Sequence, residues 1–326
     1  MNIYIDGRWD GNTGIGRVYR EVISRKPNNI EISILKSDLK LGHPLSPIYL
    51  RNKIKVSSGD VFYSPSFMPP IKSPIPFVIT IHDLNHLYYY SKFHKFYLKY
   101  IIGYLASKAK KIITVSQFTK HEIVEKLKID CNKVEVIYNG IDSSFTLNNE
   151  SYLLERPYFL YIGNKRKYKN IIRMLRAFAH AEIPNEYMLA ISGNTNPELD
   201  NEIKLLGIAN RIKFLGTINN ADLPKIYKGA YALLFVSLME GFGLPILEAM
   251  ASGTPVITSN ISSLPEIAGN AALFVDPFAV RDISNAIERL VKDVDLSNTL
   301  IGLGYERSKK FNWNETAKQT WDIILK

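Results

Sequence analysis

The chain lacks several features that would restrict its class. Among its 326 residues there is one cysteine, Cys131, which excludes an internal disulfide and fits a reducing compartment. No apolar run is long enough to span a bilayer. The N-terminus shows neither a basic leader nor a long apolar stretch, so we expect no signal peptide and a cytoplasmic location.

Acidic residues are fewer than basic ones. Against 31 Asp and Glu stand 41 Lys and Arg, which gives a net charge of +10. Such a surface favours anionic partners, namely nucleic acid, anionic lipid or phosphorylated substrates. We find no known nucleic-acid-binding module, so we expect no specific nucleic-acid partner. A lysine-rich composition that only keeps the protein soluble is the alternative.

Short apolar runs alternate with helical patterns along the chain. Because these runs are rich in Ile, Val and Tyr, they indicate parallel strands buried on both faces and joined by crossover helices. The predicted strands are 2–7, 30–35, 61–64, 77–83, 111–116, 133–139, 158–163, 187–193, 212–216, 231–237, 254–259 and 271–276. The predicted helices lie near 14–26, 91–110, 117–128, 170–181, 198–206, 221–229, 245–252 and 279–293.

The polar stretch 142–151 has neither a strand nor a helix pattern, and we interpret it as a linker. It separates a domain at 1–145 from a second domain at 152–305. The amphipathic tail at 306–326 is expected to cross back to the first domain, with its tryptophans packed in the core. The predicted fold class is α/β, with two Rossmann-like doubly wound domains facing across a cleft. In such sheets, ligands bind beyond the carboxyl ends of the strands.

The stretch SLMEGFGLPILEAMASG, 237–253, follows a predicted strand and opens a predicted helix. Gly241 and Gly243 let the backbone approach a ligand, and the helix start offers amides and a dipole to a phosphate. Glu240 and Glu248 would repel that phosphate, but they can accept hydrogen bonds from sugar hydroxyls. A nucleotide sugar therefore fits this stretch. Alternatively, Glu248 only stabilises the helix dipole and Glu240 is a solvated turn residue.

The segment EGFGLPILE, 240–248, resembles the Glu-x7-Glu motif of the retaining glycosyltransferases of family 4, which have the GT-B fold. The similarity covers nearly the whole chain. It continues in VSQFTKHEI (115–123), VIYNGID (136–142), FLG (214–216) and ASGTPVITSNISSLPEIAGNAALFVDP (251–277). DVFYSP (60–65), TIHDL (80–84) and GNKRKYKN (163–170) resemble most the bacterial mannosyl- and rhamnosyltransferases that build lipopolysaccharide and other surface glycans.

The resemblance implies a role for each part of this motif. Glu240 would contact the donor-sugar hydroxyls, and Glu248 would bind the ribose. The diphosphate would rest on the backbone amides of the intervening turn, which are those of Gly241, Phe242, Gly243 and Leu244. Ile218 matches the position whose backbone contacts the base.

The loop after the predicted strand 158–163 matches the family in part. Lys169 stands at the family's lysine position, whereas Asn164 replaces the usual arginine. Lys165, Arg166 or Lys167 would supply the missing charge, or else these three form a solvated basic loop.

In the first domain, the resemblance places Gly14 and Gly16 of GNTGIGRV under the donor phosphates. Two alternatives are a dinucleotide fingerprint that uses Asp38 and a packing turn without a ligand. His82, at the carboxyl end of a predicted strand, matches a family histidine that lies beside the transferred sugar.

The segment 86–111 mixes aromatic residues with lysines. Its aromatic residues at helical spacing favour core packing, and they are Phe93, Phe96, Tyr97, Tyr100 and Tyr104. Tyr88 to Tyr90, Lys92, Lys95 and Lys99 could instead form a surface that faces an anionic membrane or a lipid diphosphate acceptor. A peripheral contact at the inner face of the membrane would follow.

The resemblance implies a retaining hexosyltransferase that moves a hexose to a hydroxyl of a glycan or lipid-linked glycan acceptor. Its donor would be a GDP- or UDP-linked sugar, with mannose from GDP-mannose as the first choice. His82, Lys169 and Glu240 would be catalytic. We expect no cofactor and no metal, because Lys169 and backbone amides would stabilise the leaving diphosphate. The alternative, which Asn164 favours, is a catalytically degenerate nucleotide-sugar-binding protein.

Overall fold

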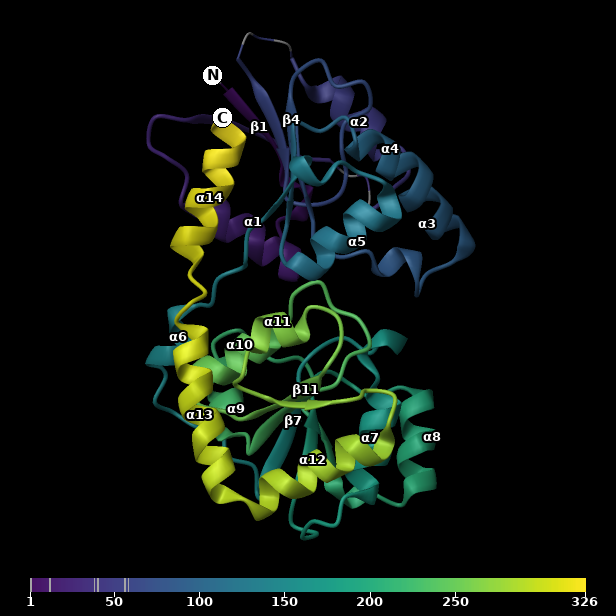
Figure 1. The fold of residues 1–326 in the computed structure, drawn as a ribbon, viewed down its shortest axis with the longest axis vertical. Helices are drawn as coiled ribbons and strands as arrows, with labels where there is room; N and C mark the ends of the chain where they lie inside the picture. The colour runs from purple at the N-terminus through teal and green to yellow at the C-terminus, as the bar shows by residue number, and fades with distance from the viewer. Residues whose placement is uncertain (1, 12, 38, 40, 56, 58) are drawn as a thin grey trace. The chain divides into compact units, whose positions relative to one another are not determined.

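The computed structural model describes the whole chain except Met1, Asn12, Asp38, Lys40, Val56 and Ser58 (Figure 1). Asp38, on which the dinucleotide alternative depends, is thus outside the described residues. The chain divides into two compact units. Unit 1 comprises Met1–Gly140 and Asn312–Lys326, and unit 2 comprises Ile141–Phe311. Each unit is built on one six-stranded sheet, which confirms the α/β class and the two doubly wound domains.

Unit 1 has a parallel sheet of order β2-β1-β3-β4-β5-β6. The middle strands β3 and β4 are buried at every residue, as expected for a sheet covered on both faces. The strands are β1 Asn2–Asp6, β2 Glu31–Leu35, β3 Val61–Ser64, β4 Phe77–Ile81, β5 Lys111–Thr114 and β6 Val134–Val136. The helices are α1 Gly14–Ser24, α2 Ser46–Lys53, α3 Lys92–Phe96, the π-helix Tyr97–Ile102, α4 Gly103–Ala106, α5 Gln117–Leu127 and α14 Trp313–Leu325.

Helix α14 belongs to unit 1 although it ends the chain, and it lies beside α1 (Figure 1). Trp321 is 2% exposed, and its indole Nε1 donates a hydrogen bond of 2.9 Å to the carbonyl oxygen of Val22 in α1. Trp313 and Ile324 are buried on the same helix. The predicted core packing of both tryptophans is confirmed.

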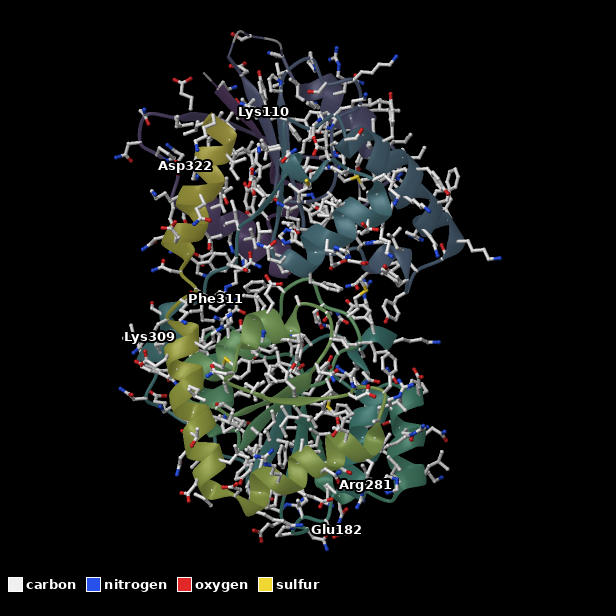
Figure 2. The ribbon with its side chains drawn as sticks, in the orientation of Figure 1. Lys110, Glu182, Arg281, Lys309, Phe311 and Asp322 are labelled. Carbon is white, nitrogen blue, oxygen red and sulfur yellow. The ribbon has the colours of Figure 1, made fainter. Side chains whose placement is uncertain are left out.

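Unit 2 has a parallel sheet of order β12-β11-β10-β7-β8-β9. The strands are β7 Tyr158–Tyr161, β8 Met188–Ile191, β9 Ile212–Phe214, β10 Ala232–Phe235, β11 Val256–Ser259 and β12 Leu273–Val275. The helices are α6 Ser143–Leu147, α7 Ile171–His180, α8 Pro197–Leu206, α9 Leu223–Gly229, α10 Leu244–Ala251, α11 Leu264–Ala268, α12 Val280–Lys292 and α13 Val294–Ser308. Phe311 ends the unit (Figure 2). Its ring packs edge-on against that of Phe242, with 5.9 Å between the ring centroids.

The predicted linker at 142–151 contains a short helix, α6. The prediction that this stretch contains no helix is therefore wrong. Asp142 caps this helix by accepting a hydrogen bond of 2.8 Å from the amide of Ser144. Phe145 is buried and packs edge-on against Tyr227, with 5.8 Å between ring centroids. One buried apolar side chain in a polar stretch is too weak a periodic signal to predict such a helix.

Of the five aromatic residues of segment 86–111 predicted to pack in the core, Tyr97 is partly buried and packs against it, whereas the other four do not. Phe93, Phe96, Tyr100 and Tyr104 are 59%, 56%, 55% and 64% exposed, respectively, and the core contacts come from Leu98, Ile102 and Leu105 instead. The predicted single helix is divided into α3, the π-helix and α4. Among the residues that the structure describes, no helix is long and apolar enough to cross a membrane.

We predict that Gly140→Ala destabilises unit 1. A Cβ at Gly140 would lie 2.2 Å from the backbone nitrogen of Trp313, so the start of α14 would have to move. We expect a loss of about 1–3 kcal/mol in the free energy of unfolding, as for overpacked cores. The measurement is urea denaturation followed by tryptophan fluorescence, because Trp9, Trp313 and Trp321, the three tryptophans of the chain, all belong to unit 1.

Gly302→Ala in α13 is the matched control for this substitution. A Cβ there meets nothing within 4 Å, and α13 belongs to unit 2. We expect its tryptophan-detected transition to stay at the wild-type urea concentration. An unchanged midpoint for Gly140→Ala would contradict the predicted clash.

Candidate active site

The predicted residues of unit 2 lie in loops that follow neighbouring strands. Asn164, Lys165 and Lys169 follow β7, and the turn that begins at Glu240 follows β10. Strands β7 and β10 are hydrogen-bonded in parallel, so their carboxyl ends lie at the same edge of the sheet. The two loops therefore meet at the edge where ligands bind in sheets of this kind.

Lys169 and Glu240 form an ion pair at this edge. The Nζ of Lys169 lies 2.6 Å from Oε1 of Glu240, and the two side chains are only 10% and 12% exposed. The same Nζ lies 5.0 Å from the ring centroid of Phe235, at the end of β10. Because little water screens these charges, the ammonium group is held in place where it can act on an anion.

The turn between Glu240 and α10 has a backbone that only glycine adopts readily. Gly243 is the N-cap of α10 at φ 118°, and a Cβ there would lie 2.9 Å from Cδ2 of Leu264. The hydroxyl of Ser263, just before α11, donates hydrogen bonds to the carbonyls of Glu240 (3.0 Å) and Phe242 (2.8 Å). These contacts hold the turn in one shape without a ligand.

Glu248 is 5% exposed and lies inside α10, beyond its first turn. Its Oε2 accepts a hydrogen bond of 2.8 Å from the hydroxyl of Tyr227 in α9. A carboxylate at this place does not serve the helix start, so the alternative of a dipole-stabilising residue does not fit. Tyr227 sets the orientation of the carboxylate.

Asn164 and Lys165 shape the loop after β7. The carbonyl of Asn164 accepts a hydrogen bond of 2.6 Å from the hydroxyl of Tyr161, and its side-chain Oδ1 accepts one of 3.1 Å from the amide of Arg166. Lys165 Nζ donates to the carbonyl of Ser192, at 2.7 Å. Burial lowers the pKa of Lys165.

Basic side chains gather beside this loop. They line a cavity of about 190 Å³ and are Lys165, Arg166, Lys167 and Arg173. This grouping favours the interpretation in which the loop supplies the charge that Asn164 lacks. Ile218, partly buried, lies in the loop after β9.

Three residues that hold the site together were not predicted, namely Asn170, Tyr227 and Ser263. Asn170 has φ 62°, and its Nδ2 donates hydrogen bonds to the carbonyls of Val236 (3.0 Å) and Pro277 (2.7 Å). It thereby ties the loop after β7 to the loops after β10 and β12. The only signal in the sequence is that asparagine tolerates this backbone conformation.

In unit 1, Gly14 and Gly16 open α1. Thr13 caps this helix, and its hydroxyl accepts a hydrogen bond of 3.0 Å from the amide of Gly16. A Cβ at Gly16 would lie 1.9 Å from the carbonyl oxygen of Gly11, whereas one at Gly14 meets nothing within 4 Å. Gly16 is thus required by packing alone, and the role of both glycines at the donor phosphates stays a prediction.

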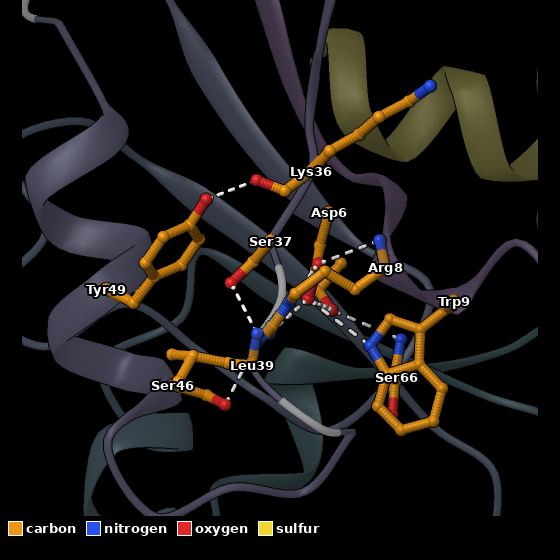
Figure 3. Close-up of polar contacts among 10 residues, drawn as sticks. Asp6, Arg8, Trp9, Lys36, Ser37, Leu39, Ser46, Tyr49 and Ser66 are labelled. Atoms are coloured by element: carbon orange, nitrogen blue, oxygen red, sulfur yellow. Dashed lines mark hydrogen bonds and ion pairs between the residues drawn. The ribbon is translucent and has the colours of Figure 1, made fainter.

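The loop that leads to these glycines starts from a buried ion pair that the sequence analysis missed (Figure 3). Asp6, at the end of β1, is fully buried and accepts two hydrogen bonds of 2.7 Å from Arg8. The indole of Trp9 donates to the same carboxylate at 3.2 Å, and Arg8 also donates to the hydroxyl of Ser46 at 2.8 Å. A strand-ending Asp followed two residues later by Arg is the only trace of this network in the sequence.

His82 follows β4, and its Nε2 lies 2.8 Å from the carbonyl oxygen of Pro65. Because a carbonyl only accepts, Nε2 carries the hydrogen and Nδ1 of the neutral ring is an acceptor. Burial lowers the pKa of His82 and outweighs the hydrogen bond to Pro65, which raises it. The ring is therefore neutral at pH 7.

Comparison with known proteins decides the family. Residues 18–145 match the model of Glycosyltransferase Family 4, and residues 146–307 match that of Glycosyl transferases group 1. The chain is 31% identical over 277 residues to O-antigen chain mannosyltransferase B of Escherichia coli, which covers 80% of this chain and 72% of that protein. It is also 31% identical over 256 residues to O-antigen chain mannosyltransferase RfbU of Salmonella typhimurium, with 74% and 69% covered.

The chain belongs to glycosyltransferase family 4. The resemblance to bacterial mannosyltransferases of surface glycans is confirmed by these relatives.

Solved structures show the same fold for this glycosyltransferase. Anabaena Alr3699/HepE in complex with UDP and glucose superposes with a TM-score of 0.81, covers 99% of this chain and 98% of that chain, and is 17% identical. WaaG, a glycosyltransferase involved in lipopolysaccharide biosynthesis, gives a TM-score of 0.75 at 14% identity, with 99% of each chain covered. The predicted GT-B fold is confirmed.

The predicted acidic pair and lysine are all held in place, Lys169 and Glu240 by their ion pair and Glu248 by Tyr227. Their contacts do not favour the degenerate alternative, which Asn164 alone supports. Within the described ranges, no group of three or more His, Cys, Asp or Glu side chains could hold a metal ion. That the reaction needs no metal or cofactor stays a prediction.

We predict that His82 makes the stability of unit 1 depend on pH. The unfolded ring binds a proton below about pH 6.5, while the folded ring, with its lowered pKa, stays neutral. The free energy of unfolding is therefore highest above pH 6.5 and falls as the pH drops below this value. Urea denaturation read by tryptophan fluorescence at a series of pH values measures this slope.

His82→Asn should flatten the slope, whereas His121→Asn, on the exposed surface of α5, should keep it. A slope that survives in His82→Asn would refute a neutral ring with a lowered pKa.

Proposed function

We propose that this glycosyltransferase transfers mannose from GDP-mannose, with retention of the anomeric configuration, to a hydroxyl of a glycan or lipid-linked glycan. The single observation that carries the proposal is the buried Lys169–Glu240 pair at 2.6 Å, where the loops after β7 and β10 meet. The choice of mannose is supported by relatives named O-antigen chain mannosyltransferases. A nucleotide-sugar donor is supported by a structural neighbour that holds UDP and glucose.

In this mechanism, Glu240 accepts hydrogen bonds from the donor-sugar hydroxyls, and the Lys169 ammonium faces the departing diphosphate. The amides of the turn between Glu240 and α10 add further donors, from Gly241, Phe242, Gly243 and Leu244. Each preorganised donor contributes roughly 2.7–4 kcal/mol to lowering the barrier. Because these groups are fixed before the donor binds, they need no reorganisation during the reaction.

The bond between the anomeric carbon and the diphosphate oxygen breaks, and a bond from that carbon to the acceptor oxygen forms on the same face. The acceptor proton passes to the leaving phosphate oxygen, so no protein nucleophile takes part. His82 accepts a hydrogen bond from the transferred sugar through Nδ1. We assign no proton transfer to it, because its ring is neutral and Nε2–H is bound to Pro65.

The remaining predicted residues place the nucleotide. Glu248, oriented by Tyr227, accepts from the ribose hydroxyls, and the backbone at Ile218 contacts the base. Lys165 adds positive charge beside Asn164. For Gly14 and Gly16 we retain the role that the family resemblance implies, at the donor phosphates. The free, exposed thiol of Cys131 supports a cytoplasmic location, and we propose that the acceptor is met at the inner face of the membrane.

We predict that GDP-mannose raises the unfolding temperature more than other GDP-, UDP-, dTDP- and ADP-sugars. At a hundred times its Kd a ligand stabilises the folded state by about 2.7 kcal/mol, which moves the transition by several degrees. NMR of the product formed from the best donor reads the configuration of the new bond. A stronger shift with a UDP-sugar would overturn the choice of GDP-mannose, and an inverted product would overturn retention.

We predict that substitutions of Glu240 and Glu248 change different kinetic constants. Glu240→Ala should lower kcat by about 100- to 1,000-fold, because it removes contacts to the sugar and leaves Lys169 without its partner. Glu248→Gln should mainly raise KM for the donor, by about tenfold, because it weakens a charged hydrogen bond while keeping an acceptor for Tyr227.

Steady-state kinetics with varied donor concentration separate these effects. Glu186→Ala, an exposed carboxylate before β8, is the control and should behave as the wild type. Near-normal rates for both site variants would refute the site.

A further inference from the structure

A stripe of aromatic side chains faces solvent on unit 1. Phe93, Phe96, Tyr100 and Tyr104 follow one another at steps of three, four and four residues along α3, the π-helix and α4. They are between 55% and 64% exposed. We call these four residues the aromatic stripe. The opposite face of the same segment already packs in the core, because Leu98 and Ile102 are only 2% and 0% exposed. The stripe is therefore not needed to attach this segment to the core.

The stripe has an apolar neighbour from a distant part of the chain. The hydroxyl of Tyr97 donates a hydrogen bond of 3.0 Å to the carbonyl oxygen of Pro44, which holds the loop before α2 against the π-helix. Leu45 and Ile48, on either side of the start of α2, are 54% and 46% exposed. The exposed apolar surface therefore draws on two segments, and it is larger than the scattered single residues normal on protein surfaces.

The charge along the stripe segment itself has one sign. Between Asp83 and Glu122 the sequence contains seven lysines and neither Asp nor Glu. Lys92, Lys95 and Lys99 are exposed within the stripe segment itself. The ammonium group of Lys99 lies 5.4 Å from the ring centroid of Tyr100. Long lysine side chains beside aromatic rings can keep their charge in the head-group layer while their methylenes cover apolar surface.

These observations favour one kind of binding partner for the aromatic stripe. A second copy of the chain would bring the same lysines against each other, which opposes a symmetric contact. A surface that is apolar beneath and anionic at its rim satisfies both the rings and the lysines. Aromatic residues are enriched at membrane interfaces, and each lysine near an anionic leaflet adds attraction.

We propose that the aromatic stripe and its lysines dock unit 1 onto an anionic phospholipid surface. The rings enter the interfacial layer, and the lysines bind lipid phosphates. The inference goes beyond the transfer reaction and does not depend on the identity of the donor, because it rests on surface residues with no assigned role in the site.

The test is sedimentation of the full-length protein with vesicles. Vesicles of phosphatidylcholine alone are compared with vesicles that also contain phosphatidylglycerol, at low and at physiological salt. We expect binding to the anionic vesicles, weakened by salt, and little binding to the neutral ones. Equal binding to both kinds of vesicle would overturn the anionic part of the proposal, and no binding to either would overturn all of it.

Two variants test whether the surface is this one. Lys92→Gln/Lys95→Gln/Lys99→Gln should lower partitioning roughly a hundredfold, since each lysine near such a surface contributes about fivefold. Phe96→Ser/Tyr100→Ser should lower it at least about tenfold through lost apolar burial. Because the altered side chains are exposed, folding is expected to be kept, and the far-UV circular dichroism and tryptophan fluorescence check it.

Matched controls remove the same groups from unit 2. Lys204→Gln/Lys213→Gln/Lys228→Gln removes three exposed lysines, and Leu205→Ser removes a side chain that is 74% exposed. Both should partition as the wild type does. An equal loss in the lysine control would show that the net charge, not this surface, governs binding.

Two further measurements separate the remaining outcomes. In sedimentation velocity we expect the free protein to be monomeric. If it forms an oligomer that dissociates in the stripe variants, the stripe would instead be an interface with a second copy of the chain. Transfer to a water-soluble acceptor should be unchanged in the stripe variants. Failure of vesicle binding with intact transfer would then overturn the docking surface and leave the proposed function standing.

Discussion

The contact between Lys169 and Glu240 is the constraint on which the site of unit 2 depends. The two residues are 71 positions apart in the chain, yet their charged atoms lie 2.6 Å apart and nearly out of water. Buried opposite charges stabilise a fold only when they are kept at contact distance. Asn170 and Ser263 provide this restraint, because they bind backbone carbonyls of the loops that carry the pair. The result is a site whose electrostatics are set before any substrate arrives.

The family resemblance predicts an arginine at position 164, where this chain has Asn164. The usual arginine would bring a long cation into the loop after β7. Asn164 instead orders that loop through Tyr161 and the Arg166 amide, and positive charge is gathered nearby by Lys165 and Arg173. The charge of the region is thus kept while its position is changed, which is the kind of difference by which members of one fold come to hold different donors.

Much of the fold could be predicted from the sequence, because each buried parallel strand is a short run of β-branched and aromatic residues. Glu240 and Glu248 could be singled out because they share one local motif, and Lys169 because its own loop resembles that of the family. Their partners could not. Tyr227 lies 21 residues from Glu248, and no spacing rule links them. Likewise, the hydrogen bond from Arg8 to Ser46 joins residues 38 positions apart, which come together only in the folded chain.

The exposure of the aromatic stripe was wrongly predicted for a related reason. Helical spacing shows that Phe93, Phe96, Tyr100 and Tyr104 share a face, but not which way that face points. The aliphatic residues of the same segment form a second apolar face, and this is the face that packs in the core. Helices α6 and α13 were missed because each buries too few residues to produce a clear period; in α13 these are Leu300, Gly304 and Ser308.

The return of the C-terminus to unit 1 also orders events on the ribosome. Unit 2 is complete in sequence at Phe311, whereas unit 1 needs Asn312–Lys326, which are synthesised after all of unit 2. While these residues are still in the exit tunnel, α1 has no Trp321 to cover it. The first-made half of this polypeptide must therefore wait, unfinished, until its closing helix has emerged, which reverses the usual N-to-C order of domain folding during translation.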